Sequence, residues 1–202
     1  MATRGRPRAF DRTGALRRAM EVFWEHGYEG SSIHQLTAAM GINAPSLYAA
    51  FQCKEALFRE AVELYGAEGG DLIGRSLAGG GTARDAVAAM LRLGAAEYTD
   101  QSHPRGCMIV LAATTYTPKT EGIRDYLAEC RRQSAGQLRD RLAKGVADGD
   151  LDPETDLDRL ANYLSTVWYG MSLQARDGAT TEELLDVADA AMAGWDRLTG
   201  SR

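Results

Sequence analysis

The stretch from Ser31 to Lys54 constrains the fold of this chain more than any other, because it reads as two short helices broken by one glycine. Ser32 is a favourable N-cap residue, and apolar residues follow it at helical spacing. Gly41 stands where the first helix must end in a residue that tolerates a positive φ, and Asn43 can cap the second helix. The stretch therefore predicts a helix-turn-helix, a motif whose second helix commonly enters the major groove of DNA.

The second helix of this motif is expected over residues 44–51, with Leu47 and Phe51 turned inward. Its other side carries small residues with few hydrogen-bond donors. We therefore expect methyl contacts to thymine and one weak hydroxyl contact to the bases. The candidate base-reading residues are Ala44, Pro45, Ser46 and Ala49.

Three further residues are candidates for contacts with the DNA backbone. Tyr48 lies near the end of the second helix, and Lys54 lies at the N-terminus of the next one, where phosphate groups are favourably bound. Thr37 in the preceding helix can add a hydroxyl. For Tyr48 the alternative is packing against the first helix.

Residues 1–10 form a basic arm that contains Arg4-Gly5-Arg6-Pro7-Arg8 and resembles the core of an AT-hook. The glycine lets the backbone approach the floor of a narrow A·T-rich minor groove, and the negative potential there attracts guanidinium groups. We expect Arg4, Arg6 and Arg8 to bind DNA in this way. The alternative is a solvated tail.

Several signals occur in order over about residues 8–65: the basic arm, a helix ending in His-Gly-Tyr, Gly-Ile-Asn at the turn, Ser-Leu-Tyr-x-x-Phe, and Cys-Lys-Glu-Ala-Leu. This pattern resembles the N-terminal domain of the TetR/AcrR family of one-component transcriptional repressors. The resemblance implies that Tyr48 and Lys54 contact phosphate. It also implies an all-α fold with an arm and helix-turn-helix DNA-binding domain over residues 1–53 and an effector-binding and dimerisation domain over residues 54–202.

Apolar periodicity predicts helices along the rest of the chain, about nine in total. One is expected from residue 54 to about 68, and the glycine-rich stretch after it reads as a linker. The nearly uncharged segment 107–116 is expected to be buried all round. The remaining helices are expected at about residues 82–100, 120–147, 156–176 and 181–198.

The last two predicted helices are apolar enough to need a partner. The simplest partner is the same pair in a second copy, which makes a four-helix bundle about a two-fold axis. A homodimer also reads two half-sites, whereas one short recognition helix makes few contacts. The alternative is that the pair only closes the core of the monomer.

In the resemblance, an effector pocket lies among the fourth to eighth helices. Aromatic residues, methionines and few charges suggest a small, largely apolar effector. The competing interpretation is that most of these residues are plain core. The candidate lining residues are Tyr65, Met90, Tyr98, Met108, Ala112, Thr115, Tyr116, Tyr126, Trp168, Met171 and Gln174.

Cys107 offers an alternative function, a thiol that senses oxidants or electrophiles. It follows Arg105 and Gly106 near an expected helix N-terminus, where the dipole and a guanidinium can lower a thiol pKa. An inert buried thiol is the competing interpretation. A metal site from His103, Cys107 and Cys130 lacks the ligand spacing of known sites, so we expect no metal and no cofactor.

Charge and motifs limit the remaining function classes. The net charge of −5 argues against a protein that coats nucleic acid everywhere, whereas the basic N-terminal segment fits contact with DNA at one end. The motifs Gly-x-Ser-x-Gly, Gly-x-Gly-x-x-Gly and His-Glu-x-x-His are absent, so we expect no enzyme. A helix-turn-helix that binds protein is disfavoured by the arginine arm. Because the chain has neither a leader nor a long apolar run, we expect a cytoplasmic protein.

These observations predict a ligand-responsive transcriptional repressor. It should bind double-stranded DNA at a palindromic operator as a homodimer and leave it when a small effector binds. The thiol-based regulator that uses Cys107 is the alternative.

Overall fold

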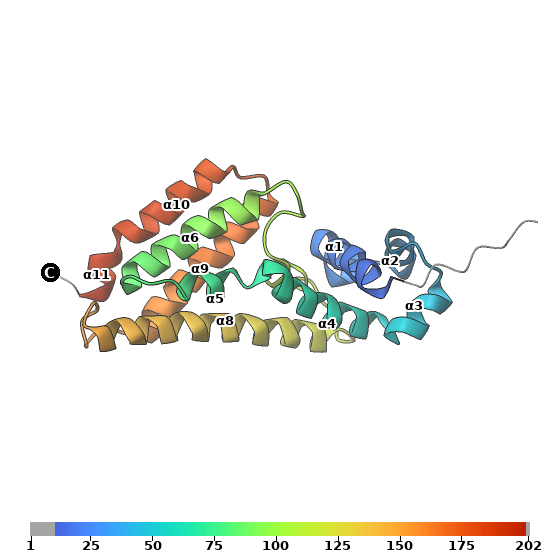
Figure 1. Cartoon of the computed structure of the whole chain (residues 1–202), viewed down its shortest axis with the longest axis horizontal. Helices are drawn as coiled ribbons and strands as arrows, with labels where there is room; N and C mark the ends of the chain where they lie inside the picture. Colours follow the sequence, from blue (N-terminus) through green and yellow to red (C-terminus); the bar gives the residue numbers. More distant parts are fainter. Residues whose placement is uncertain (1–10, 201–202) are drawn as a thin grey trace, which may run out of the picture.

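The computed structural model describes residues 11–200, so the predicted arm with Arg4, Arg6 and Arg8 lies outside the described residues. Its elements are α1 (Arg12–Gly30), α2 (Ile33–Met40), α3 (Ala44–Phe51), α4 (Lys54–Tyr65), the π-helical turn η1 (Gly66–Gly70), α5 (Leu72–Leu77), α6 (Ala83–Thr99), α7 (Met108–Leu111), α8 (Glu121–Asp148), α9 (Leu157–Arg176), α10 (Thr181–Ala193) and α11 (Trp195–Thr199). Every regular element of residues 11–200 is helical, which confirms the all-α prediction. A head made of α1–α3 is joined by α4 to a larger body (Figure 1).

The helix-turn-helix has the predicted boundaries, and local caps explain them. The Ser32 hydroxyl accepts a hydrogen bond from the Gln35 N–H, and the Gln35 side chain accepts one from the Ser32 N–H. Gly41 ends α2 with φ 69°, a conformation that residues with a Cβ rarely adopt. Asn43 caps α3 by accepting from the Ser46 N–H at 2.9 Å. The turn is therefore fixed by residues within the motif itself.

An aromatic cluster joins α1 to α4 inside the head. The rings of Phe23 and Phe58 meet edge to face, with 5.0 Å between centroids, and the Tyr28 ring lies 5.1 Å from that of Phe58. Leu47 and Phe51 of α3 are buried in the same core, as predicted. The first half of α4 thus shares the core of the head. The predicted domain division between residues 53 and 54 separates helices that pack together.

The chain between α4 and α6 is irregular where glycine is frequent. The predicted helix from residue 54 ends as an α-helix at Tyr65, and Gly69 within η1 has φ 122°. The helix α5 was not predicted, because its six residues lie within the stretch that reads as linker. Asp71 caps it, and Leu72, Ile73 and Leu77 are buried. This short helix therefore belongs to the core of the body.

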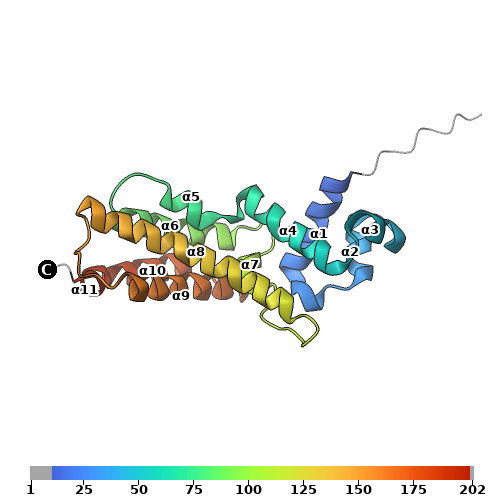
Figure 2. The same ribbon diagram turned by 90° about the horizontal axis from the view of Figure 1, so that it is seen from below.

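The body is a layered helix bundle. The 28-residue α8 runs along its length (Figure 1), and α9 and α10 lie together along the lower side of the body in Figure 2. Within the bundle, α6 packs against α5, α9 and α10, and α8 packs against α5 and α9. The buried side chains of this core include Val87, Met90, Leu91, Tyr98, Met108, Ile123, Leu127, Leu138, Leu142, Leu160, Leu164, Trp168 and Met171.

Two predicted segments differ from the structure. The segment 107–116 is not buried all round, since residues 114–116 are exposed, Tyr116 to 44%, and the helix α7 has only four residues. After α7 the chain crosses the surface, where the hydroxyl groups of Thr117 and Thr120 hydrogen-bond to Glu29. The last predicted helix divides at Gly194 into α10 and α11.

The segment between α6 and α8 forms a second junction between head and body. The Trp24 indole Nε1–H donates to the Gly106 carbonyl at 3.1 Å. The Tyr28 N–H donates to the Ala112 carbonyl, with 2.7 Å between nitrogen and oxygen. Head and body are therefore connected through α7 as well as through α4.

Arg176, at the end of α9, strengthens this junction. Its guanidinium donates to the carbonyls of Trp24 and Glu25, at 2.7 and 3.2 Å, and to that of Arg105 at 3.2 Å. The α-helical path of α1 is broken at Gly27, where φ is 72°. The carbonyls of Trp24 and Glu25 precede this break, and the usual helical partner of the Trp24 carbonyl, the Tyr28 N–H, donates to the Ala112 carbonyl instead. Arg176 supplies a donor in its place and puts a positive charge where the helix dipole favours it.

Candidate DNA interface and effector cavity

The outer surface of α3 carries the predicted base-reading residues. Pro45, Ser46 and Ala49 are exposed, and Ala44 is half-buried. Only Ser46 among them has a side-chain hydrogen-bond donor. The structure therefore brings the four residues together on a surface with few hydrogen-bonding groups, as predicted.

The hydroxyl groups of Tyr48 and Thr37, both predicted to contact the DNA backbone, differ in whether they are free to do so. Tyr48 is 47% exposed, so its side chain is not buried against α1. Thr37 is half-buried, and its hydroxyl donates to the carbonyls of Ile33 and His34 at 2.8 and 3.0 Å. The hydroxyl hydrogen of Thr37 is thus used inside its own helix, whereas Tyr48 can meet a ligand.

Lys54 is held in place at the N-terminus of α4. Its ammonium donates to the Tyr28 carbonyl at 2.6 Å and lies 4.3 Å from the centre of the Tyr28 ring. Burial lowers the pKa of Lys54, and Glu29 acts against this shift. An ammonium has three N–H donors, so two remain for a phosphate. The residue is positioned by the head itself before DNA arrives.

Replacing Lys54 by Met should weaken binding to all duplexes alike and reduce the slope of log K against log salt by about one unit, because one phosphate contact is lost. Met keeps an unbranched side chain over Tyr28 and removes the charge. Fluorescence anisotropy at several salt concentrations measures the slope. Lys144→Met, at the distant end of α8, is the control and should leave it unchanged. An unchanged slope for Lys54→Met would contradict the phosphate contact.

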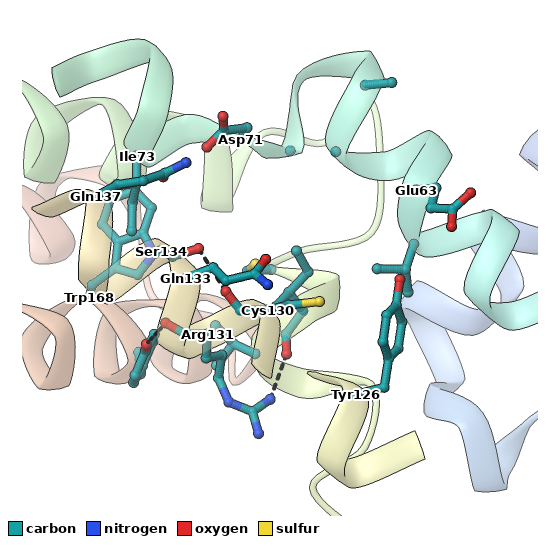
Figure 3. Close-up of a pocket in the computed structure, with 18 of the residues that line it drawn as sticks. Glu63, Asp71, Ile73, Tyr126, Cys130, Arg131, Gln133, Ser134, Gln137 and Trp168 are labelled. Atoms are coloured by element: carbon teal, nitrogen blue, oxygen red, sulfur yellow. Dashed lines mark hydrogen bonds between the residues drawn. The ribbon is translucent and has the colours of Figure 1, made fainter. Parts of the chain in front are cut away.

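A cavity of about 360 Å³ lies in the body between η1, α7, α8 and α9. Its aromatic floor consists of Tyr98 and Trp168, whose ring centres are 5.0 Å apart. Along α8, Tyr126, Cys130 and Ser134 line it at intervals of four residues, so they lie on one side of the helix (Figure 3). We call this space the body cavity.

Charged groups surround the body cavity unevenly. Glu63 and Asp71 lie at its rim, and neither forms an ion pair within residues 11–200. The Arg131 guanidinium turns to the Ile109 carbonyl, to which it donates at 2.8 Å (Figure 3). The rim is therefore acidic, and the one cationic side chain that the described residues contribute to the lining is already engaged with the backbone.

The predicted ligand-binding residues do not all lie at one cavity. Tyr98, Tyr126 and Trp168 line the body cavity. Met90, Met108, Ala112 and Met171 are at most 2% exposed and do not line it, so for these four the plain-core interpretation holds. The others lie elsewhere: Tyr65 borders a second cavity, Gln174 a shallow depression at the end of α9, and Thr115 and Tyr116 are exposed.

Sequence reasoning missed most of the polar lining of the body cavity. One of these residues could have been found from the sequence. Ser134 is a polar residue on the otherwise apolar inner side of α8, between Leu127 and Leu138, and such a residue indicates a cavity. The rim residues carried no such signal, since charged residues at helix ends are ordinarily solvated. The missed residues are Glu63, Asp71, Arg131, Gln133, Ser134, Gln137 and Tyr169.

A second cavity, of about 410 Å³, lies at the junction of head and body. We call it the junction cavity. The ion pair of Arg17 with Glu68 borders it, and the His103 ring stacks on Trp24 with 4.6 Å between centroids. Tyr98 borders both cavities, so the two lie back to back in the molecule.

The surroundings of Cys107 do not activate its thiol. The side chain is 6% exposed, and the Tyr65 hydroxyl donates to its sulfur at 3.5 Å. Burial raises the pKa of Cys107, and the nearby tyrosine hydroxyls oppose this only in part. The Arg105 guanidinium donates to the Ala179 carbonyl and is not among the groups that lower the pKa of the thiol. The expectation of a lowered thiol pKa is therefore wrong, and the redox alternative is not favoured.

The three cysteines should react with iodoacetamide in the order of their exposure and thiolate content. Cys53 is exposed and should be alkylated first, whereas Cys107 is buried with a raised pKa and should react last. Because the thiolate is the nucleophile, the rate at Cys107 should rise between pH 7 and pH 9. Mass spectrometry of timed digests measures each site. Alkylation of Cys107 as fast as Cys53 at pH 7 would restore the redox alternative.

Residues 11–200 offer neither a metal-binding cluster nor a membrane-spanning helix. No group of three or more His, Cys, Asp or Glu side chains there is placed to hold a metal ion, and His103 and Cys107 lie with different partners. None of the helices in that range is both long and apolar enough to cross a membrane.

Comparisons with known sequences cover both parts of the chain. The profile described as "Bacterial regulatory proteins, tetR family" matches residues 15–61, and the profile described as "Tetracyclin repressor-like, C-terminal domain" matches residues 81–192. The HTH-type transcriptional repressor ComR of Escherichia coli (strain K12) is 33% identical, over 97% of this chain and 94% of its own length. The HTH-type transcriptional repressor BdcR of the same strain is 28% identical, over 94% of this chain and 90% of its own length.

A solved structure resembles the whole molecule. A cysteine mutant of the TetR family transcriptional regulator CifR, complexed with 26-base-pair double-strand operator DNA, is 49% identical to this chain. The match covers 94% of this chain and 100% of that one, with a TM-score of 0.91. The reduced form of NemR from E. coli, at 19% identity and a TM-score of 0.75, shares the fold.

Proposed function

The chain belongs to the TetR family of transcriptional regulators, and from this premise we propose that it is a repressor that binds a palindromic DNA operator as a homodimer and leaves it when a small molecule enters the body cavity. The exposed small-residue surface of α3, flanked by Tyr48 and Lys54, carries the DNA-binding part of this proposal. No catalytic role is part of it.

The homodimer is supported by the outer surface of α9. Leu173 is 51% exposed and Tyr163 is 38% exposed, although both belong to a helix whose inner side is tightly packed. On α10, Leu185 and Val187 are half-buried. Apolar side chains of this size at the surface favour a protein partner, and a second copy of the same helix pair completes a four-helix bundle.

Release by an effector is supported by the connection between the body cavity and the head. Ile109 and Val110 of α7 line the cavity, and α7 is followed by its C-cap residue Ala112, whose carbonyl accepts from the Tyr28 N–H. The Tyr28 carbonyl in turn accepts from Lys54. A ligand that displaces α7 therefore acts on the residue proposed to hold a phosphate. It shifts the population of DNA-binding conformations by the difference in its affinity for them.

A gel shift against the DNA upstream of the protein's own gene tests the proposal, with a scrambled duplex as competitor at two salt concentrations. We expect one specific complex of two chains per duplex, which a pool of small metabolites dissolves. Size-exclusion chromatography with light scattering measures the mass of the free protein. A monomer without preference for any duplex at low salt would contradict the proposal.

A further inference from the structure

One buried hydroxyl at the body cavity has no partner. Tyr98 is 1% exposed, and its hydroxyl makes no hydrogen bond within the described residues. Proteins pair nearly all buried polar groups with protein, water or ligand, because an unpaired group has lost its hydration without compensation. Beside the hydroxyl lies the Cys107 sulfur, a weak acceptor, so the hydroxyl is available to donate to a stronger acceptor on a ligand.

The surroundings of this hydroxyl assign it to the body cavity rather than to the junction cavity. It lies near the Cys107 sulfur, which already accepts from the Tyr65 hydroxyl. Cys107 and Trp168 line the body cavity and do not line the junction cavity, although Tyr98 borders both. A ligand that lies on the Trp168 ring can thus place an acceptor atom at the hydroxyl.

The charges around the cavity restrict the ligand further. Glu63 and Asp71 at the rim repel anions, and the Arg131 guanidinium points away from Trp168 towards the Ile109 carbonyl (Figure 3). A carboxylate placed on the floor would be desolvated without a cation to compensate it. A volume of about 360 Å³ has room for a compound with one or two rings.

We propose that the body cavity selects neutral aromatic compounds that carry a carbonyl or similar acceptor oxygen, that Tyr98 donates the selecting hydrogen bond, and that aromatic carboxylates are rejected. This rests on the proposed function, because it concerns the cavity assigned there to the effector. The sequence predicted a largely apolar ligand. The proposed ligand is instead an aromatic compound with one acceptor oxygen at a defined position.

Three probes of nearly equal shape test the proposal: acetophenone, cumene and benzoate. The first carries a carbonyl, the second a branched hydrocarbon at the same place, and the third a carboxylate. Binding is followed by NMR on the indole N–H signals of the three tryptophans, without DNA. Trp168 reports on the body cavity, Trp24 reports on the junction cavity, and Trp195, which lines neither, is the internal control.

We expect the Trp168 signal to titrate with acetophenone at an affinity about tenfold higher than with cumene, and not to respond to benzoate. In Tyr98→Phe, which removes only the hydroxyl, acetophenone and cumene should bind equally. In Tyr65→Phe, whose hydroxyl is occupied by the Cys107 sulfur, the preference for acetophenone should remain.

Three results would overturn the proposal: equal affinity of the wild-type protein for acetophenone and cumene, a Trp168 response to benzoate as strong as to acetophenone, or a response at Trp24 alone. The wild-type comparison stands even where a variant fails to fold. A parallel gel shift with acetophenone distinguishes a failure of the proposed ligand class from a failure of the proposed effector-controlled release. Selective binding at Trp168 without an effect on DNA leaves the ligand class standing and contradicts effector-controlled release.

Discussion

Replacing Leu173 by Glu is expected to abolish the homodimer and to lower operator affinity by about 100-fold or more. In a two-fold interface the same residue occurs on both chains, so the substitution buries two carboxylates without partners. The monomer that results can read only one half-site, which supplies roughly half of the binding free energy. Light scattering measures the mass, and fluorescence anisotropy with the operator measures the affinity.

The control for this variant is Ala96→Glu, an exposed position on α6 outside the proposed interface. It should leave mass and affinity unchanged. Leu173 is half exposed in the single chain, so its replacement should also leave the fold of the monomer intact by circular dichroism. A stable Leu173→Glu dimer would show that the subunits pair through another surface.

Replacing Gly106 by Ala is expected to reduce the free energy of unfolding by about 3 kcal/mol, because backbone strain and a steric clash add. Gly106 has φ 78°, and a Cβ there would lie 2.6 Å from the Ser172 carbonyl oxygen and 2.7 Å from a methyl group of Leu111. Neither the backbone of α9 nor the packed α7 can move away freely. Urea unfolding measures the loss.

Gly178→Ala separates the two causes. Gly178 also has a positive φ, 108°, but a Cβ added there would meet no atom within 4 Å, so only strain of about 1 kcal/mol is expected. Gly106 also accepts from Trp24, so its replacement should disturb the junction of head and body. Equal losses in the two variants would mean that α7 and α9 adjust to the added methyl group.

The head could be predicted from the sequence because its determinants are local. Ser32, Gly41 and Asn43 each fix a helix end through neighbours no more than a few residues away. The same is true of Thr82, which begins α6 with a capping box. For these elements, residue type and spacing already contain the interaction that decides the structure.

The body cavity could not be predicted to the same extent, because distant segments build it. Tyr98 and Trp168 are far apart in the sequence and meet only when α6 and α9 pack. Met90 and Met171 lie at helical spacing from the cavity residues Tyr98 and Trp168, yet they are fully buried in the core. Periodicity identifies the inner side of a helix and gives no sign of where packing leaves a gap.

Arg176 gives the C-terminal end of α9 a second role. In the proposed dimer, the helix that offers Leu173 to the second subunit also holds α1, because the guanidinium of Arg176, about one turn further along, contacts Trp24 and Glu25. If the two copies of α9 meet at the two-fold axis, each reading head is linked to that axis through this short connection. A small tilt of one α9 against the other would then change the distance between the heads, so the spacer length tolerated between half-sites can evolve without any change on α3.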